Sequence, residues 1–399
     1  MRAVSKRHGS MPTGPSLGST TLSRRAFLRR TAGAAVALGA GSSLLAACGD
    51  DGGGSGKGDN GEVVVMGWTV YLTPEIQKAF RDATGITLKA VAAPDDQSMF
   101  TKVKAGGGAQ YDVVFANCGW APTYQQNDLV EVLDLDEIPA AADLWPQFKE
   151  DASLPYVVEP NKVLLYPNMW SSTAMMWNTQ VDWQPEEPYS WNDLWSAPRG
   201  KVMLHGAPED FIAMAGMALG VPREEIYKLT GSELEGAAKY LKELKPFQIS
   251  PNSDSVTASA IASGKAYIAF ASSLGVAYKA NTEFGKGQEV ARSVVPTEGA
   301  LGWVDGPQIV KGAKNRDNAL AFIDFFGGNT EIQDYLWDEY FFAQCNKKST
   351  ERTLAAGDEG SETAKAIGAD RPELASELLM LAPPEDAAAW TQAYDSVIG

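Results

Sequence analysis

The sequence predicts an α/β protein of two lobes, and three observations lead to this class. Short apolar runs rich in β-branched residues alternate with helical patterns from residue 62 onward. Such alternation favours mostly parallel sheets with helices on both faces. About 340 residues follow the N-terminal segments, which is more than one hydrophobic core usually organises. No internal repeat of solenoid or propeller period is visible, so two lobes are expected rather than an array.

The first 47 residues have the pattern of an export signal. Ser23–Arg30 reads SRRAFLRR, and a weakly apolar run rich in Ala and Gly continues to Ala47. This run is shorter and less hydrophobic than the ~20 apolar residues of a membrane-spanning helix. The paired arginines favour the Tat route. Together with the cysteine that follows, they predict a Tat-type lipoprotein signal peptide over residues 1–47.

Residues 48–61 are predicted to be a lipid attachment site and a tether. Leu44–Cys48 reads LLAAC and resembles a bacterial lipobox, in which Cys48 would be lipidated and become the mature N-terminus. The next stretch, GDDGGGSGKGDN, is too polar and glycine-rich to offset its chain entropy by burial, so a flexible linker is expected. The alternative is a buried Cys48 in a small hydrophobic helix. The expected location is the outer face of the cell membrane, with the lipid as the only membrane contact.

The mature chain would be strongly acidic. The whole sequence carries 34 basic and 50 acidic residues, and seven of the basic ones lie in the first 47 residues, which contain no acidic residue. The remainder has 27 basic against 50 acidic groups, a formal charge of −23. Such a chain is repelled by phosphate backbones and by anionic lipid, so nucleic-acid binding is not expected. A cationic ligand would be attracted.

Two cysteines remain after Cys48, at Cys118 and Cys345. In an exported protein they form either one disulfide or two buried thiols, and we favour the disulfide. It would close a loop of more than 200 residues, for which chain-entropy models give about 5 kcal/mol of stabilisation.

The first strand and helix of the mature chain are predicted from EVVVMGW and the residues after it. Thr73 is expected to cap the helix, Pro74 to occupy its first turn, and Gly85 to end it. Its apolar face would comprise Ile76, Phe80 and Ala83.

Later patterns continue the alternation. Strands are predicted at ITLKAVA, YDVVFAN, GKVMLHG, GKAYIAF and RSVVPTEG, and a helix at SMFTKVKAG. In open α/β sheets ligands bind beyond the carboxyl ends of the strands. Trp68 and Asn117 occupy such positions.

Enzyme motifs are largely absent from the sequence. It has no HExxH, GxSxG, zinc-type cysteine pair, EF-hand loop or phosphate loop, so no catalytic residue, metal or cofactor is expected. The two histidines are His8, in the signal, and His205, which ends a predicted strand. His205 is either a hydrogen-bonded structural residue or a ligand contact.

From Val63 to about Lys348 the chain resembles the solute-binding component of an ABC importer, and specifically the spermidine/putrescine-binding group of periplasmic receptors. The stretches that carry this resemblance are WTVYLTPEIQKAFRDATGI, YDVVFANCGW, NDLVEVLD, YPNMWSSTAMMWN, YSWNDLWSAPRGKVML, ASGKAYIAF and GWVDGPQIVKGAKNRDNALAFIDFF. They occur in the order and spacing of that family.

The resemblance implies a type II periplasmic-binding-protein-like fold, in which two lobes joined by crossing strands close on a ligand cleft. Lobe 1 would comprise residues 62–167 plus 305–345, and lobe 2 residues 168–304 plus 346–399. The implied partners are a small solute and an ABC permease in the membrane, and the protein is expected to be a monomer.

The resemblance also implies a set of ligand-binding residues. The family's first strand-to-helix turn lines the cleft, and those places match Trp68, Thr69 and Tyr71 here. Aromatic walls and an amine-accepting carboxylate are implied at Phe270, Trp303 and Asp305, with a small polar group at Asn117. Aromatic faces suit an alkyl chain that bears ammonium groups. The alternatives are core roles for Phe270 and Trp303, and a helix cap or salt bridge for Asp305.

The chain departs from the family at HGAPEDF. The places where polyamine receptors usually offer two acidic residues match Ala207 and Asp210, although a shift of one residue in the matching would select Glu209 instead. Because an unpaired buried charge is costly, the missing carboxylate leaves open a receptor for another nitrogenous solute, such as a quaternary amine or an opine-like compound. A surface-anchored hydrolase is the alternative from another function class, and the sequence offers no clear nucleophile and base pair for it.

Overall fold

The structure is a computed structural model that describes residues 61–244, 248–249 and 253–398. The predicted signal peptide, Cys48 and all but the last residue of the predicted linker lie outside these residues. Within the described segments, none of the helices combines the length and the hydropathy of a membrane span.

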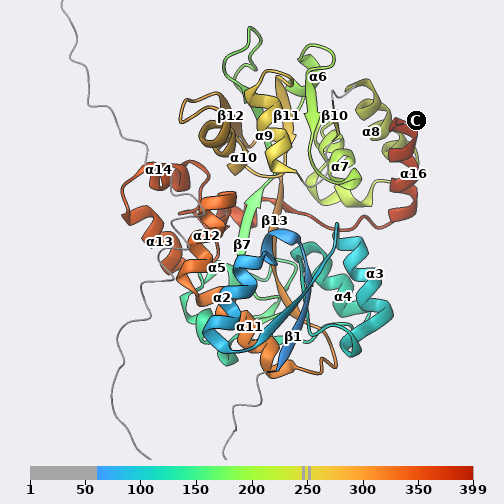
Figure 1. The fold of residues 1–399 in the computed structure, drawn as a ribbon. Coiled ribbons are helices and arrows are strands. Elements are labelled where there is room, and N and C mark those ends of the chain that lie inside the picture. The colour runs from blue at the N-terminus through green and yellow to red at the C-terminus, as the bar shows by residue number, and fades with distance from the viewer. Residues whose placement is uncertain (1–60, 245–247, 250–252, 399) are drawn as a thin grey trace, which may run out of the picture. The chain divides into compact units, whose positions relative to one another are not determined.

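A seven-stranded sheet organises the first lobe (Figure 1). Its strand order is β14-β7-β13-β3-β1-β2, and β15 pairs with β13. The strands are β1 (Glu62–Gly67), β2 (Thr87–Ala92), β3 (Val113–Asn117), β7 (Met169–Ser172), β13 (Leu301–Ile309), β14 (Ala343–Gln344) and β15 (Leu379–Met380). The main helices of this part are α2 (Pro74–Thr84), α3 (Asp96–Gly106), α4 (Ala121–Gln126), α5 (Gln147–Glu150), α11 (Arg316–Gly328), α12 (Thr330–Tyr340), α13 (Lys347–Ala355), α14 (Glu359–Ala366) and α15 (Leu374–Glu377). A small sheet of β4 (Leu133–Asp134), β6 (Lys162–Val163) and β5 (Val157–Glu159) adjoins them in sequence.

A five-stranded sheet organises the second lobe. Its order is β10-β9-β11-β8-β12, formed by β8 (Ala174–Asn178), β9 (Val202–Leu204), β10 (Gln248–Ile249), β11 (Ile268–Ala271) and β12 (Ala291–Val294). The helices are α6 (Asp193–Ser196), α7 (Pro208–Ala218), α8 (Gly231–Leu244), α9 (Asp254–Ala262), α10 (Gly275–Lys279) and α16 (Ala387–Ile398). A large apolar cluster fills the space between this sheet and α7, α8 and α16.

The chain crosses between the two sheets three times. β7 leads into β8 through Thr173, β12 leads into β13 through residues 295–300, and β15 leads toward α16. The first two crossings are bonded to each other, because Thr173 N donates to Leu301 O (2.7 Å) and Leu301 N donates to Thr173 Oγ1 (3.1 Å). The two-lobed α/β fold predicted from the sequence is therefore confirmed.

The expectation of mostly parallel sheets is wrong, because both sheets are mixed. β1 pairs in parallel with β2 and β3, but β13 runs antiparallel to β3 and to β7. The reason is topological. β7 carries the chain out of the first lobe and β13 carries it back, so neighbouring crossing strands must run in opposite directions.

The predicted capping residues of α2 are confirmed, and its predicted apolar face is confirmed in part. Thr73 Oγ1 accepts a hydrogen bond from Ile76 N (3.4 Å), and Gly85 ends the helix in the left-handed conformation (φ 75°). Ile76 and Phe80 are fully buried, whereas Ala83 is exposed rather than on the apolar face. Each of the later strands and the helix predicted from the sequence is present.

Candidate functional site

Asp305, on β13, lies at the centre of the candidate site. The Tyr71 hydroxyl donates a hydrogen bond to Asp305 Oδ2 (2.9 Å), and Asn117 Nδ2 donates one to Asp305 Oδ1 (3.2 Å). Asn117 ends β3 and pairs directly with Asp305 in the sheet register. Asp305 is thus brought into contact with two other predicted ligand-binding residues, each more than 180 residues before it in the sequence.

Aromatic packing fixes the position of Tyr71. Its ring stacks on Phe115 of β3 with 4.2 Å between ring centroids, and Phe326 of α11 meets it edge-on at 6.1 Å. Tyr71 belongs to a short 3₁₀ turn (Thr69–Tyr71) that directly follows β1. Tyr71 is 1% exposed. Burial is the main cause that raises the pKa of its hydroxyl, and the charge of Asp305 raises it further. The hydroxyl therefore remains a proton donor to the carboxylate.

Asn117 is held by a second set of bonds. Its backbone N donates to Asp96 Oδ1 (3.0 Å), and its side-chain Oδ1 accepts from Gly119 N (2.9 Å). The second bond fixes which side of the amide faces Asp305. Asn117 is buried, so few other partners compete for these groups.

Asp96 is a site residue that the sequence analysis missed. It is the first residue of α3, which follows β2 at the edge of the sheet where β1 and β3 also end. The pair Asp95–Asp96 after a strand end was the available signal. Burial raises the pKa of Asp96 well above its usual range, the bond from Asn117 N opposes this, and the charges of Asp305 and Glu209 raise it further.

The second lobe contributes carboxylates from the start of α7. Asp210 Oδ2 accepts a hydrogen bond from Ala207 N (2.8 Å), so the predicted ligand residue Asp210 caps the N-terminus of its own helix. Burial raises the pKa of both Glu209 and Asp210. The charge of Glu209 raises the pKa of Asp96 in the other lobe. The charge of Asp95, next to Asp96, raises the pKa of Glu209.

In the part of the chain that the structure describes, these carboxylates have no lysine or arginine as an ion-pair partner. Burial raises the pKa of Asp305 to about 6, and the bonds from Tyr71 and Asn117 only partly offset that effect. No lysine or arginine is among the groups that shift Asp96, Glu209, Asp210 or Asp305. Among the ion pairs between described residues, none includes one of the four. Removing charges from water without a partner is costly, so this arrangement suits a cationic ligand.

The predicted aromatic walls have different surroundings. Phe270 is fully buried in the core of the second lobe, between Trp191 (5.2 Å) and Phe211 (5.8 Å), which is the core role left open above. Trp303 is 7% exposed, and its indole N–H donates to Ser272 O (3.0 Å), which ties β13 to the second lobe.

The two remaining predicted residues lie at the turn after β1. Trp68 is partly buried against an apolar cluster of the first lobe that includes Met66 and Trp120, so part of this residue remains accessible. Thr69 is exposed, and its backbone O accepts from Leu72 N (3.1 Å) within the 3₁₀ turn. Neither side chain contacts Asp305 through a hydrogen bond among the described residues.

The favoured disulfide between Cys118 and Cys345 is not formed, and both are free, buried thiols. The sheet register explains the difference. Asn117, Asp305, Met169 and Gln344 lie opposite one another on four consecutive strands, which places the first and last about 14 Å apart. Each cysteine follows one of these outer two residues, whereas a disulfide needs Cα atoms about 4.4–6.8 Å apart.

His205 has a structural environment. Its Nε2 accepts from Ser253 N (2.8 Å), and its Nδ1 lies 3.3 Å from Asp254 Oδ1. Ser272 Oγ donates to the same Asp254 oxygen (2.6 Å) rather than to the histidine. The carboxylate therefore stands between the hydroxyl and the imidazole, which is not the order that a histidine general base requires.

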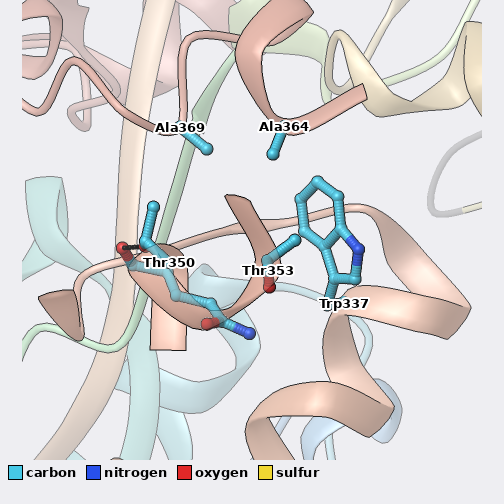
Figure 2. A pocket seen from close by; sticks show the side chains of 6 residues that line it. Trp337, Thr350, Thr353, Ala364 and Ala369 are labelled. Carbon is cyan, nitrogen blue, oxygen red and sulfur yellow. Dashed lines mark hydrogen bonds between the residues drawn. The ribbon is translucent and has the colours of Figure 1, made fainter. Parts of the chain in front are cut away.

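A small pocket lies away from these residues, and Figure 2 shows five of its side chains labelled. It is lined by Trp337, Gln344, Thr350, Thr353, Ala364 and Ala369, from α12, β14, α13 and the α14 region. It contains no charged side chain and none of the predicted site residues. We therefore assign the candidate site to the surroundings of Asp305.

Comparisons with known proteins agree with this architecture. The spermidine/putrescine-binding periplasmic protein of Escherichia coli (strain K12) is 26% identical over 270 residues, which cover 67% of this chain and 73% of the relative. Two solved structures share the fold. The spermidine/putrescine substrate-binding protein PotD from Streptococcus pneumoniae has a TM-score of 0.62 at 23% identity, covering 84% of this chain and 97% of that chain. The Tp0655 (TpPotD) lipoprotein of Treponema pallidum has a TM-score of 0.67 at 18% identity, covering 84% and 99%.

A family profile matches more than half of the chain. The family described as bacterial extracellular solute-binding protein matches residues 75–365, which include β2 to α14 and therefore most of both lobes and the carboxylates around Asp305. We conclude that this chain belongs to the bacterial extracellular solute-binding protein family.

Proposed function

We propose that this solute-binding protein captures a small amine of the polyamine class and delivers it to an ABC permease. The observation that carries the proposal is the environment of Asp305. Its carboxylate is oriented by Tyr71 and Asn117 and is partly buried, and no ion pair between described residues includes it. A ligand ammonium group would supply the missing charge and form a charge-assisted hydrogen bond.

The surrounding carboxylates support a ligand with more than one cationic group. Asp96 of the first lobe and Glu209 of the second influence each other electrostatically. A second ammonium group between them would relieve their mutual repulsion as well as their desolvation. The names of the relatives, which include spermidine and putrescine, agree with such a ligand.

An opine-like solute fits the same site less well. Such a compound carries a carboxylate, which would need a lysine or arginine partner in a desolvated cleft. The groups that shift the site carboxylates include neither. A quaternary amine would retain the charge but could not donate hydrogen bonds to Asp305, so it ranks below a primary or secondary amine.

A thermal-shift screen tests this proposal. The purified protein is heated with spermidine, putrescine, choline, amino acids and sugars, and each hit is then titrated by calorimetry. Stabilisation grows with ligand concentration relative to the dissociation constant, so the polyamines should give the largest shifts. A largest shift with a sugar or an acidic amino acid would refute an amine ligand, and turnover of any amine or ester would support the hydrolase alternative.

We further propose that lipid on Cys48 anchors the protein to the outer face of the membrane. The LLAAC sequence and the glycine-rich stretch after it support this, because a tether separates the anchor from the folded lobes. Cys48→Ser should release or mislocalise the protein while solute binding is retained. Unchanged membrane association of the variant would contradict lipidation at this position.

A further inference from the structure

We infer that residues 378–385 form a strap that holds the turn after β3 in place, and that Gly119 in this turn is a positioning residue for the solute-binding carboxylate Asp305. The strap is the third crossing between the lobes. The inference rests on the proposed function in taking Asp305 as the group that receives the solute cation.

The strap is attached to both lobes by backbone hydrogen bonds. Leu379 N donates to Ala300 O, directly before β13 (3.2 Å), and Leu381 N donates to Gly302 O on β13 (2.7 Å). At its other end, Glu385 N donates to Tyr227 O of the second lobe (3.0 Å). Movement of one lobe relative to the other must therefore either carry the strap along or break these bonds.

Gly119 provides the space in which the strap lies. A Cβ atom added to this residue would lie 1.3 Å from Leu381 O and 2.9 Å from Ala382 Cα, so the backbone of the strap would have to move. The backbone of Gly119 is not in the left-handed region, which means that glycine is required for space and not for conformation. Next to it, Cys118 Sγ lies 3.8 Å from Met380 Sδ.

The turn passes this constraint to the site through one side chain. Gly119 N donates to Asn117 Oδ1 (2.9 Å), and Asn117 Nδ2 donates to Asp305 Oδ1 (3.2 Å). A displaced Gly119 would release the Asn117 amide, and Asp305 would keep only the bond from Tyr71. Gly119 thus acts on Asp305 through Asn117 without touching the solute.

A titration of Asp305 separates a positioning role from a merely structural one. The groups that face this carboxyl are the donors Tyr71 and Asn117, with Asp96, Cys118 and Cys345 close enough to interact electrostatically. Because the bond from Asn117 lowers the pKa of Asp305, its loss should raise that pKa. The carboxyl group would then be protonated over a wider range of pH and would bind a cation less well.

The test compares Gly119→Ala with Gly236→Ala, a matched change on α8, where an added Cβ meets nothing within 4 Å. The Asp305 carboxyl carbon is titrated by NMR in the protein without solute, and spermidine affinity is measured by calorimetry at pH 7.5. Gly119→Ala should raise the pKa of Asp305 and weaken binding about tenfold, whereas Gly236→Ala should change neither. An unchanged Asp305 pKa in a folded Gly119→Ala protein would overturn the inference.

A double variant checks the route through Asn117. In an Asn117→Ala background, Gly119→Ala should cause no further loss of affinity, since residues that act through one another are not additive. A full additional loss would assign Gly119 a different role. If Gly119→Ala does not fold, Met380→Ala, which removes the contact with Cys118, should raise the Asp305 pKa in the same direction. The NMR titration needs no solute, so a parent protein that binds no polyamine would refute the proposed function while the Asp305 pKa still decides this inference.

Discussion

At the level of single residues, Phe270 is a core side chain, and its contribution to stability can be measured. Phe270 is fully buried between two other rings, so Phe270→Ala should lower the free energy of unfolding by about 3–5 kcal/mol through lost burial and a cavity. Phe284→Ala is the control, because that ring is 41% exposed, and it should cost well under 1 kcal/mol. Chemical denaturation measures both. A Phe270→Ala protein that is as stable as the parent but does not bind solute would show that Phe270 contacts the ligand rather than the core.

Sequence reasoning found residues whose local pattern sets their role and missed those that depend on distant contacts. Thr73 and Gly85 were recognised from helix-capping chemistry, which involves only near neighbours. Asp305 and Tyr71 came from a family resemblance, and no local pattern places them 2.9 Å apart. Asp96 was missed because its position near the carboxylates depends on the pairing of β2 with β1.

At the scale of elements, strand order decides the chemistry of the cysteines. Two strands, β7 and β13, lie between the strands that precede Cys118 and Cys345. The sequence spacing could not reveal this, because it says nothing about which strands are neighbours. The cysteine count and the expected export therefore favoured a disulfide that the strand order does not allow.

A thiol assay tests the assignment. In a Cys48→Ser background, unfolded and unreduced protein should react with two equivalents of a thiol reagent, whereas the folded protein should react slowly because both sulfurs are buried and burial raises both thiol pKa values. Fewer than two reactive thiols after unfolding would indicate that Cys118 and Cys345 form a disulfide.

At the scale of the whole molecule, the desolvated carboxylates link stability to pH. The pKa of Asp305 is raised to about 6, so the folded protein binds a proton there more tightly than the unfolded chain. Its charge therefore destabilises the solute-free protein at neutral pH, and this cost decreases as the pH falls below about 6 and is lost near the ordinary aspartate pKa of about 4. His205, whose pKa burial lowers, changes stability in the opposite sense, so a comparison with a variant is needed.

Asp305→Asn isolates this contribution. We compare the free energy of unfolding of the variant with that of the parent, both without solute. The variant should be about 1–2 kcal/mol more favoured at pH 7.5 than at pH 5, because it has no charge to desolvate. Denaturation of both proteins at the two pH values measures the change. A difference that does not vary with pH would show that the Asp305 carboxyl titrates normally.

A calorimetric titration tests whether Asp305 receives the solute cation. Spermidine is titrated at pH 7.5 into the parent, Asp305→Asn and Asp128→Asn, a control that removes the same charge from a side chain that is 77% exposed. We expect Asp305→Asn to weaken binding about tenfold to a hundredfold, the effect of losing a charge-assisted hydrogen bond, and Asp128→Asn to bind as the parent does. Equal affinities for spermidine in the parent and in a folded Asp305→Asn protein would show that Asp305 does not receive the solute cation.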